Sequence, residues 1–227
     1  VVFENLALNQ IGDYDYFILE LGAFATPFTL ISVLFLINSF NYFDGLDGTL
    51  GFSSISVLAI LYFLVPNENF KFFFIILLIP ISFFILHNFS IFKLPKLFLG
   101  DGGSLLLGFL ISFILIYLAN QKYVHPILIA WSISIFVYEF LSINIIRLKN
   151  KQDIFKAGQD HLHYMLFKNS KSIFITNLLI CLLNVIMFVV GYISFLYISP
   201  LTSLILFIMF FIIFLILRNN HSKKYLI

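Results

Sequence analysis

Two short acidic turns flanked by glycine are the first residues whose types and spacing could do chemistry. Asp44 and Asp47 lie in the segment 44–48, and Asp101 lies in the segment 100–103. Each turn leads into a long apolar segment, and the N-terminus of a helix attracts anions. Mg²⁺ binds a few carboxylate or carbonyl oxygens and takes its other ligands from phosphate and water. The turns therefore favour a phosphate bridged by a metal ion, with a polar turn capped by Asp as the alternative.

A third polar group is the pair His161 and His163, which lies in the one long polar segment, 147–171. Two residues at i and i+2 do not share a face of a helix, so a short irregular turn is expected. Two histidines without cysteine are too few for a structural zinc site. The pair favours contact with a phosphate, and the alternative is two solvated loop histidines. Glu139, inside an apolar run, is either functional or a helix-packing partner.

The elements that carry these turns follow from composition. The 227 residues are 61% hydrophobic and 11% charged, whereas soluble domains average about a quarter charged. Apolar runs long enough to cross a bilayer lie at 21–43, 49–65, 70–90, 104–119, 124–146, 172–196 and 200–217. Backbone groups in hydrocarbon must bond within their own segment, so the runs are expected to be helices.

The predicted fold class is therefore an all-α polytopic transmembrane helix bundle with about seven spans. Residues 1–227 form a single membrane domain, with loops at 38–48, 91–104 and 147–171. The runs 49–65 and 104–119 are short for a span. His125 and Trp131 are interpreted as interface or packing residues. The net charge of +2 gives no reason to expect a nucleic-acid partner.

The distribution of basic residues orients the bundle. Alternating the seven spans places 11 of the 13 Lys and Arg residues on one side, and only Lys71 and Lys122 on the other. The positive-inside rule makes the richer side cytoplasmic. All three polar clusters lie on that side. The expected location is the inner (cytoplasmic) membrane, with the site facing the cytoplasm.

Three motifs, taken together, carry a resemblance to a known family. Residues 38–48 read Asn-Ser-Phe-Asn-Tyr-Phe-Asp-Gly-Leu-Asp-Gly, residues 98–104 read Phe-Leu-Gly-Asp-Gly-Gly-Ser, and residues 161–163 read His-Leu-His. Their order and spacing resemble the polyprenyl-phosphate N-acetylhexosamine-1-phosphate transferases of glycosyltransferase family 4. The resemblance implies transfer of a sugar-1-phosphate from a UDP-N-acetylated sugar to polyprenyl phosphate, with release of UMP. It implies Mg²⁺ as the cofactor, with Mn²⁺ as a substitute.

The resemblance also implies roles for individual residues. Asn41 and Asp101 match positions that hold Mg²⁺ on the pyrophosphate. Asp47 matches a position near the uridine, Phe98 matches the aromatic ring that stacks on uracil, and Asp44 matches an acidic position at the nucleotide site.

The basic loop adds three residues to this set. His161 and His163 match the family's histidine motif, and Arg147 lies where relatives carry basic residues before it. Asp44, Asp47, Asp101, His161 and His163 form the expected catalytic set. Asn41, Phe98 and Arg147 are expected to bind substrate together with Asp47 and the two histidines.

The sequence departs from the family in three ways. The family carries an Asp-Asp pair on an earlier loop and has more spans, and neither feature is found here. Because the sequence also begins without Met, we expect an N-terminally truncated chain that lacks the full catalytic set. Tyr164 stands where many relatives have another histidine, which favours the branch that starts surface polysaccharides with N-acetylglucosamine or a related sugar.

Two other classes remain as alternatives: a transporter or lipid-phosphate-binding protein without chemistry, and a degenerate family member. A transporter is expected to show paired broken helices and an internal repeat, and no repeat is visible in this sequence. Whether the protein forms a homodimer is left open by the sequence.

Overall fold

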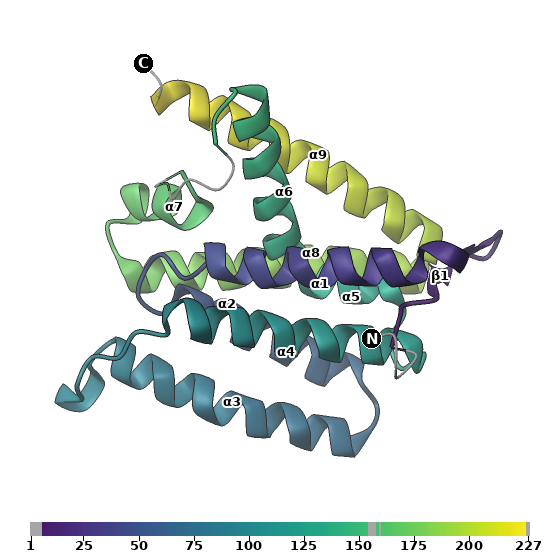
Figure 1. The fold of residues 1–227 in the computed structure, drawn as a ribbon, viewed down its shortest axis with the longest axis horizontal. Coiled ribbons are helices and arrows are strands. Elements are labelled where there is room, and N and C mark those ends of the chain that lie inside the picture. The colour runs from purple at the N-terminus through teal and green to yellow at the C-terminus, as the bar shows by residue number, and fades with distance from the viewer. Residues whose placement is uncertain (1–5, 154–157, 159, 226–227) are drawn as a thin grey trace.

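The computed structural model describes residues 6–153, 158 and 160–225, with side chains described up to residue 220. A two-stranded hairpin, β1 (Gln10–Asp13) and β2 (Ile18–Glu20), precedes nine α-helices in the described chain (Figure 1). The α-helices are α1 (Ala25–Tyr42), α2 (Thr49–Leu64), α3 (Glu68–Asn88), α4 (Gly100–Asn120), α5 (Pro126–Ser132), α6 (Ser134–Lys149), α7 (Leu162–Ser170), α8 (Ile173–Tyr197) and α9 (Pro200–Tyr225). Single 3₁₀ turns lie at Gly22–Phe24 and Ile91–Lys93.

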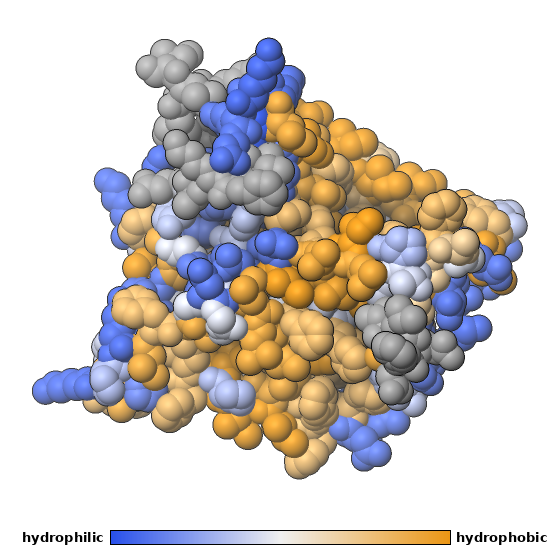
Figure 2. Space-filling model, in the orientation of Figure 1, coloured by the Kyte–Doolittle hydropathy of each residue, from blue (hydrophilic) through white to orange (hydrophobic). Residues whose placement is uncertain are grey.

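The predicted fold class is confirmed. In the described residues the bundle consists of α-helices, and several of these helices are long enough to span a membrane. Five helices are long and apolar enough to cross a bilayer, and the bent pair α5 and α6 makes six. The predicted count of seven is not confirmed, because α2 has only 16 residues, fewer than the roughly 20 that a hydrocarbon core requires. Figure 2 shows hydrophobic residues across the middle of one face and hydrophilic residues mostly toward its ends.

The predicted span 124–146 is a bent pair of helices and not a straight one. The axes of α5 and α6 differ by 74° across a break at Ile133. The buried Asn184 of α8 occupies this break: its amide nitrogen donates to the Ser132 carbonyl at 3.0 Å, and its oxygen accepts from the Ile135 N–H at 3.4 Å. Because the side chain of Asn184 satisfies backbone groups that the bend leaves without helical partners, the break is stable inside an apolar bundle.

Close packing aligns the helix ends that carry the polar turns. A Cβ on Gly108 of α4 would lie 2.9 Å from the Cα of Ile37 in α1, so only glycine permits this approach. Phe40 of α1 stacks on Phe136 of α6, with ring centroids 4.1 Å apart and the planes 7° from parallel. The end of α1 therefore lies beside the start of α4.

His125, one of the two predicted interface or packing residues, joins the hairpin to the start of α5. Its Nδ1 accepts from the Ile127 N–H and caps α5, while its Nε2 lies 2.9 Å from the Asp13 carbonyl of β1. Trp131 is fully buried, and its indole N–H donates to Ser203 at 3.0 Å. Both residues are confirmed as packing residues.

Candidate active site

Three loops that are far apart in sequence meet at one end of the helices. Ser104, at the start of α4, donates a 2.7 Å hydrogen bond to the Asn41 side chain at the end of α1. The hydroxyl of Tyr164, in α7, donates to the Gly45 carbonyl at 2.9 Å. These contacts bring the two acidic turns and the histidine turn together, as the sequence predicts.

The first acidic turn is shaped by its glycines. Gly48 has a φ of +73°, a left-handed conformation that glycine adopts without strain. A Cβ on Gly45 would lie 2.3 Å from Nε2 of His163, so glycine is what admits the imidazole ring against this loop. The Asp47 carbonyl accepts a 2.8 Å hydrogen bond from Asn177 of α8, which also accepts from Thr49. The backbone of the turn is therefore held by Asn177 of α8 and by Tyr164 of α7.

Asp44 and Asp101 form an electrostatic pair across the two turns. Burial, reinforced by the negative charge of Asp101, raises the pKa of Asp44 to about 6. A neighbouring carboxylate that disfavours the charge of partly buried Asp44 makes a place where a divalent cation would be stabilising. The Asn41 amide oxygen accepts from Ser104 at the start of α4, where Asp101 also lies, so this end of the helices offers the oxygen donors that a hard cation prefers. The described residues hold no group of three or more His, Cys, Asp or Glu side chains arranged for a metal.

The loop before α4 presents a cation and an exposed aromatic ring. Lys96 Nζ lies 2.6 Å from the Asp47 carboxylate and 5.0 Å from the centroid of the Phe98 ring. The Phe98 side chain is 72% exposed, as stacking on a flat ligand requires. Asn88 donates to the Leu97 carbonyl at 2.8 Å, and His87 Nδ1 lies 2.9 Å from the Pro95 carbonyl. Both side chains at the end of α3 thus brace this loop.

Lys96 is a site residue that sequence reasoning missed. The sequence indicates only that it belongs to the basic face, because its partner Asp47 lies 49 residues away. Asp47, expected near the uridine, is paired with this lysine in the structure.

The two histidines lie at the junction between the basic loop and α7: His161 is in an irregular bend, as predicted, whereas His163 is the second residue of the helix. His161 has extended backbone and precedes the first residue of α7, so the helical twist does not separate the rings. The imidazoles stack with centroids 5.5 Å apart and planes 7° from parallel. His161 is 7% exposed and His163 is 1% exposed, so the alternative of solvated loop histidines is wrong.

His163 is an uncharged side chain at this site. Burial, together with the charge of His161, lowers its pKa to about 3. Neither of its ring nitrogens has a hydrogen-bond partner among the described residues. Contact of a protonated His163 with a phosphate is therefore disfavoured, and a neutral imidazole that gives or accepts one hydrogen bond remains.

Arg147 holds the residue that precedes the histidine turn. Its Nη2 lies 2.7 Å from Asp160 Oδ1 and its Nε lies 3.1 Å from Oδ2, a two-point contact. Burial alone would raise the pKa of Asp160, but the Arg147 guanidinium outweighs it and holds that pKa below its usual range. Arg147 is 4% exposed. Its expected contact with substrate stays a prediction, while its contact with the loop is shown.

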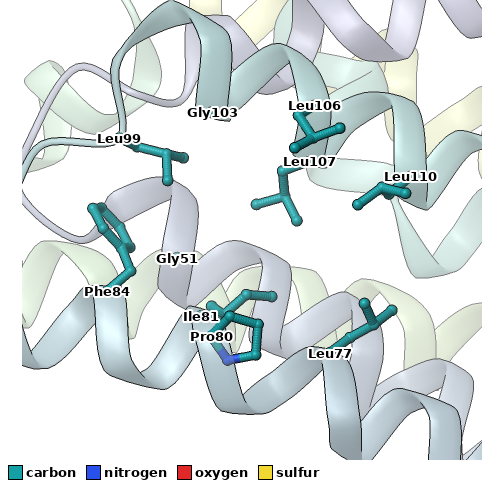
Figure 3. A pocket seen from close by; sticks show the side chains of 10 residues that line it. All are labelled: Gly51, Leu77, Pro80, Ile81, Phe84, Leu99, Gly103, Leu106, Leu107 and Leu110. Atoms are coloured by element: carbon teal, nitrogen blue, oxygen red, sulfur yellow. The ribbon is translucent and has the colours of Figure 1, made fainter.

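An apolar cavity of about 200 Å³ lies between α3 and α4, next to the second acidic turn (Figure 3). Leu99 and Gly103 border it at the turn, Pro80 and Ile81 come from α3, and Leu107 points into it from α4. Its lining contains no polar side chain, so it suits hydrocarbon and does not suit a nucleotide. The polar chemistry of the site therefore belongs to the loops.

The fold and the site define a multi-pass membrane protein with acidic and histidine turns gathered at one end of its helices. The family model described as glycosyl transferase family 4 matches residues 1–119, just over half of the 227 residues. The chain belongs to glycosyl transferase family 4.

Two relatives at moderate identity are named for the same activity. The chain is 30% identical over 175 residues to the undecaprenyl-phosphate alpha-N-acetylglucosaminyl 1-phosphate transferase of Escherichia coli O157:H7, covering 74% of this chain and 48% of that protein. It is 33% identical over 159 residues to the probable undecaprenyl-phosphate N-acetylglucosaminyl 1-phosphate transferase of Bacillus subtilis (strain 168), covering 65% of this chain and 42% of that protein. The chain spans about half the length of the curated relatives it matches.

Proposed function

We propose that the full-length protein transfers N-acetylglucosamine-1-phosphate, or a related N-acetylated sugar-1-phosphate, from a UDP-sugar to polyprenyl phosphate and releases UMP. The observation that carries the proposal is the junction of Asn41, Asp101 and the histidine turn at one end of a membrane bundle. A lipid phosphate and a water-soluble nucleotide can meet only where the bilayer ends. The family and its named relatives support the same reaction.

The cation site of the proposal consists of Asn41 and Asp101, with Asp44 beside them. When bound, Mg²⁺ neutralises the pyrophosphate and stabilises charge on the departing UMP. Asp101 is exposed at the first turn of α4, so its carboxylate is open to a ligand that arrives from water. Asn41 is held by Ser104, which keeps the amide oxygen next to that turn.

The nucleotide side of the proposal consists of Phe98, Lys96 and Asp47. The exposed Phe98 ring offers a face for the uracil base, since every base has a flat π surface. Lys96 is available to exchange its contact with Asp47 for one with a phosphate oxygen. Asp47 is then released as an acceptor for donor groups of the uridine.

The chemical step of the proposal is a phosphoryl transfer in which one P–O bond forms and another breaks. An oxygen of the polyprenyl phosphate attacks the phosphorus that carries the sugar, and the bond from that phosphorus to the UMP oxygen breaks. UMP leaves with that electron pair. His161 and the neutral His163 provide hydrogen-bonding groups beside the acidic turns, and no side chain needs to form a covalent bond.

We propose that the site faces the cytoplasm, across the inner membrane. The count of 11 basic residues against 2 supports this side. That count includes Lys156, which lies outside the described residues. The loop that carries Lys96 contacts the site through Asp47, so this loop would also attract an anionic lipid headgroup.

The proposal is tested with the full-length protein in membrane vesicles. UMP release is measured with UDP-N-acetylglucosamine and polyprenyl phosphate, with Mg²⁺ and with EDTA. We expect release that needs both substrates and stops in EDTA. If no UDP-sugar from a panel of N-acetylated donors gives UMP, the transferase proposal is wrong, and uptake of labelled substrate into the vesicles then tests the transporter alternative.

A further inference from the structure

Glu139 is a fully buried carboxylate in α6 that reaches the histidine turn. It is 1% exposed and lies 23 residues before the turn in sequence. Its Oε1 accepts a 2.8 Å hydrogen bond from the Leu162 N–H, the first amide of α7. A carboxylate at a helix N-terminus satisfies an amide without a helical partner and is attracted by the helix dipole. Glu139 therefore caps α7 from another helix.

Arg218, from the last helix α9, compensates the charge of Glu139. Its Nη2 lies 2.8 Å from Oε1 of Glu139 and donates to the Asp160 carbonyl at 2.6 Å. Its Nη1 contacts the sulfur of Met165 in α7. A buried carboxylate is costly unless a partner charge and hydrogen bonds hold it. Arg218 thus links Glu139 to the chain before His161, at Asp160, and to the chain after it, at Met165.

The geometry at His161 leaves one hydrogen bond to be completed. Its Nδ1 lies 3.7 Å from Oε1 of Glu139 and has no hydrogen-bond partner among the described residues. The other carboxylate oxygen of Glu139, Oε2, is also buried without a partner there. A small rotation of either group brings Nδ1–H onto the carboxylate. That bond would fix the tautomer and leave Nε2 for the substrate.

We propose that Glu139 and Arg218 are positioning residues for His161, with Glu139 orienting the imidazole and Arg218 keeping the carboxylate charged. The inference rests on the proposed transferase function and deepens it. It assigns a role in the reaction to α9, whose Arg218 lies 79 residues from Glu139 in sequence. Neither residue is expected to touch the substrate.

The test compares single and double substitutions in the full-length protein. Glu139→Gln and Arg218→Met each leave one buried charge without its partner, so both should lower the unfolding temperature and the rate of UMP release. The double variant removes both charges, and its unfolding temperature should return close to that of the wild type. Its kcat should stay about 10- to 100-fold below wild type, with KM for the UDP-sugar changed less than kcat.

A purely structural ion pair gives a different pattern. In that case the double variant would recover kcat together with its unfolding temperature, and the inference would be overturned while the proposed function stood. Glu68→Gln is the matched control, because it removes the carboxylate of the exposed Glu68–Lys71 pair in α3. It should change neither quantity.

Two further variants keep the inference testable if the double variant does not fold. Arg218→Lys retains a charge beside Glu139 and should recover most of the activity lost in Arg218→Met. Glu139→Asp retains the charge but withdraws it from His161, so it should fold with a lowered kcat. A folded Glu139→Asp variant with wild-type kcat overturns the inference. A wild-type protein that releases no UMP removes the proposed function and this inference together.

Discussion

His163 is a buried histidine that stays neutral across the physiological pH range, and this has a consequence for stability. Burial lowers its pKa to about 3 in the folded protein, whereas the unfolded chain has a value of about 6.5. Between these values the unfolded state binds a proton that the folded state does not. The titration of His163 therefore has no effect on stability above about pH 6.5, and it destabilises the folded protein progressively as the pH falls from there toward 3.

Replacing His163 with Asn should remove this pH dependence. The wild-type free energy of unfolding should fall by up to about 1.4 kcal/mol more per pH unit than that of His163→Asn between pH 6 and 4. Unfolding in mixed detergent micelles measures the difference. Above pH 7 the two slopes should coincide, which is the internal control, and equal slopes below pH 6 would show that His163 is protonated in the folded protein.

At the scale of elements, one side chain decides the direction of α6. Asn184 bonds both backbone groups at the Ile133 break, and its amide nitrogen also donates to Ser56 of α2 at 3.1 Å. The bend directs α6 toward the end of the bundle that carries the acidic turns, where Glu139 accepts a hydrogen bond from Leu162 beside the histidines. The position of the two histidines therefore depends on a buried polar residue in the middle of α8.

Asn184→Ala should destabilise the protein by about 2 kcal/mol or more, because it leaves buried backbone groups without partners. Asn38→Ala is the control: among the described residues, the exposed Asn38 amide donates to the Leu34 carbonyl of its own helix, so its loss should cost about 0.5 kcal/mol or less. Chemical unfolding of both variants gives the comparison. Equal stabilities would mean that the break does not depend on Asn184.

Gly191 of α8 is a contact position for the buried Trp131 ring. A Cβ there would lie 2.3 Å from the indole, whereas a Cβ on Gly102 would meet nothing within 4 Å. Gly191→Ala should therefore destabilise the α5–α8 contact by about 1–3 kcal/mol, and Gly102→Ala should leave stability nearly unchanged. Thermal unfolding separates the two, and a stable Gly191→Ala variant would contradict the packing described.

Apolar runs predict the helices well, because hydrocarbon leaves the backbone few alternatives. They do not predict the break at Ile133, since neither proline nor glycine lies there and the compensating residue, Asn184, is 51 residues further on in the chain. The N-terminal hairpin is also missed, because its strands of four and three residues are too short for a periodic signal.

The acidic turns and histidines are identified from the sequence because their residue types and spacing are local features of the chain. Arg218 is missed as a site residue because only tertiary packing brings it to Glu139.

At the scale of the whole molecule, the distribution of charge predicts which end of the bundle faces the cytoplasm. The single cysteine, Cys181, makes this testable by labelling. In a Cys181→Ser background, Lys122→Cys and Lys171→Cys are matched probes, since both positions are exposed with positive φ. A membrane-impermeant maleimide should label Lys122→Cys in intact cells and Lys171→Cys only after permeabilisation. The reverse pattern would contradict the orientation.

The same end of the molecule holds all three polar turns, and we propose that they act as one metal-dependent site. The most direct measurement is the rate of UMP release by the full-length protein and its Asp101→Ala variant, at saturating UDP-sugar, polyprenyl phosphate and Mg²⁺. Changing a residue that only supports a metal ligand costs about 10- to 100-fold, so loss of a ligand should cost at least about 100-fold. An Asp101→Ala protein that releases UMP at the wild-type rate would show that Asp101 is not a metal ligand of this site.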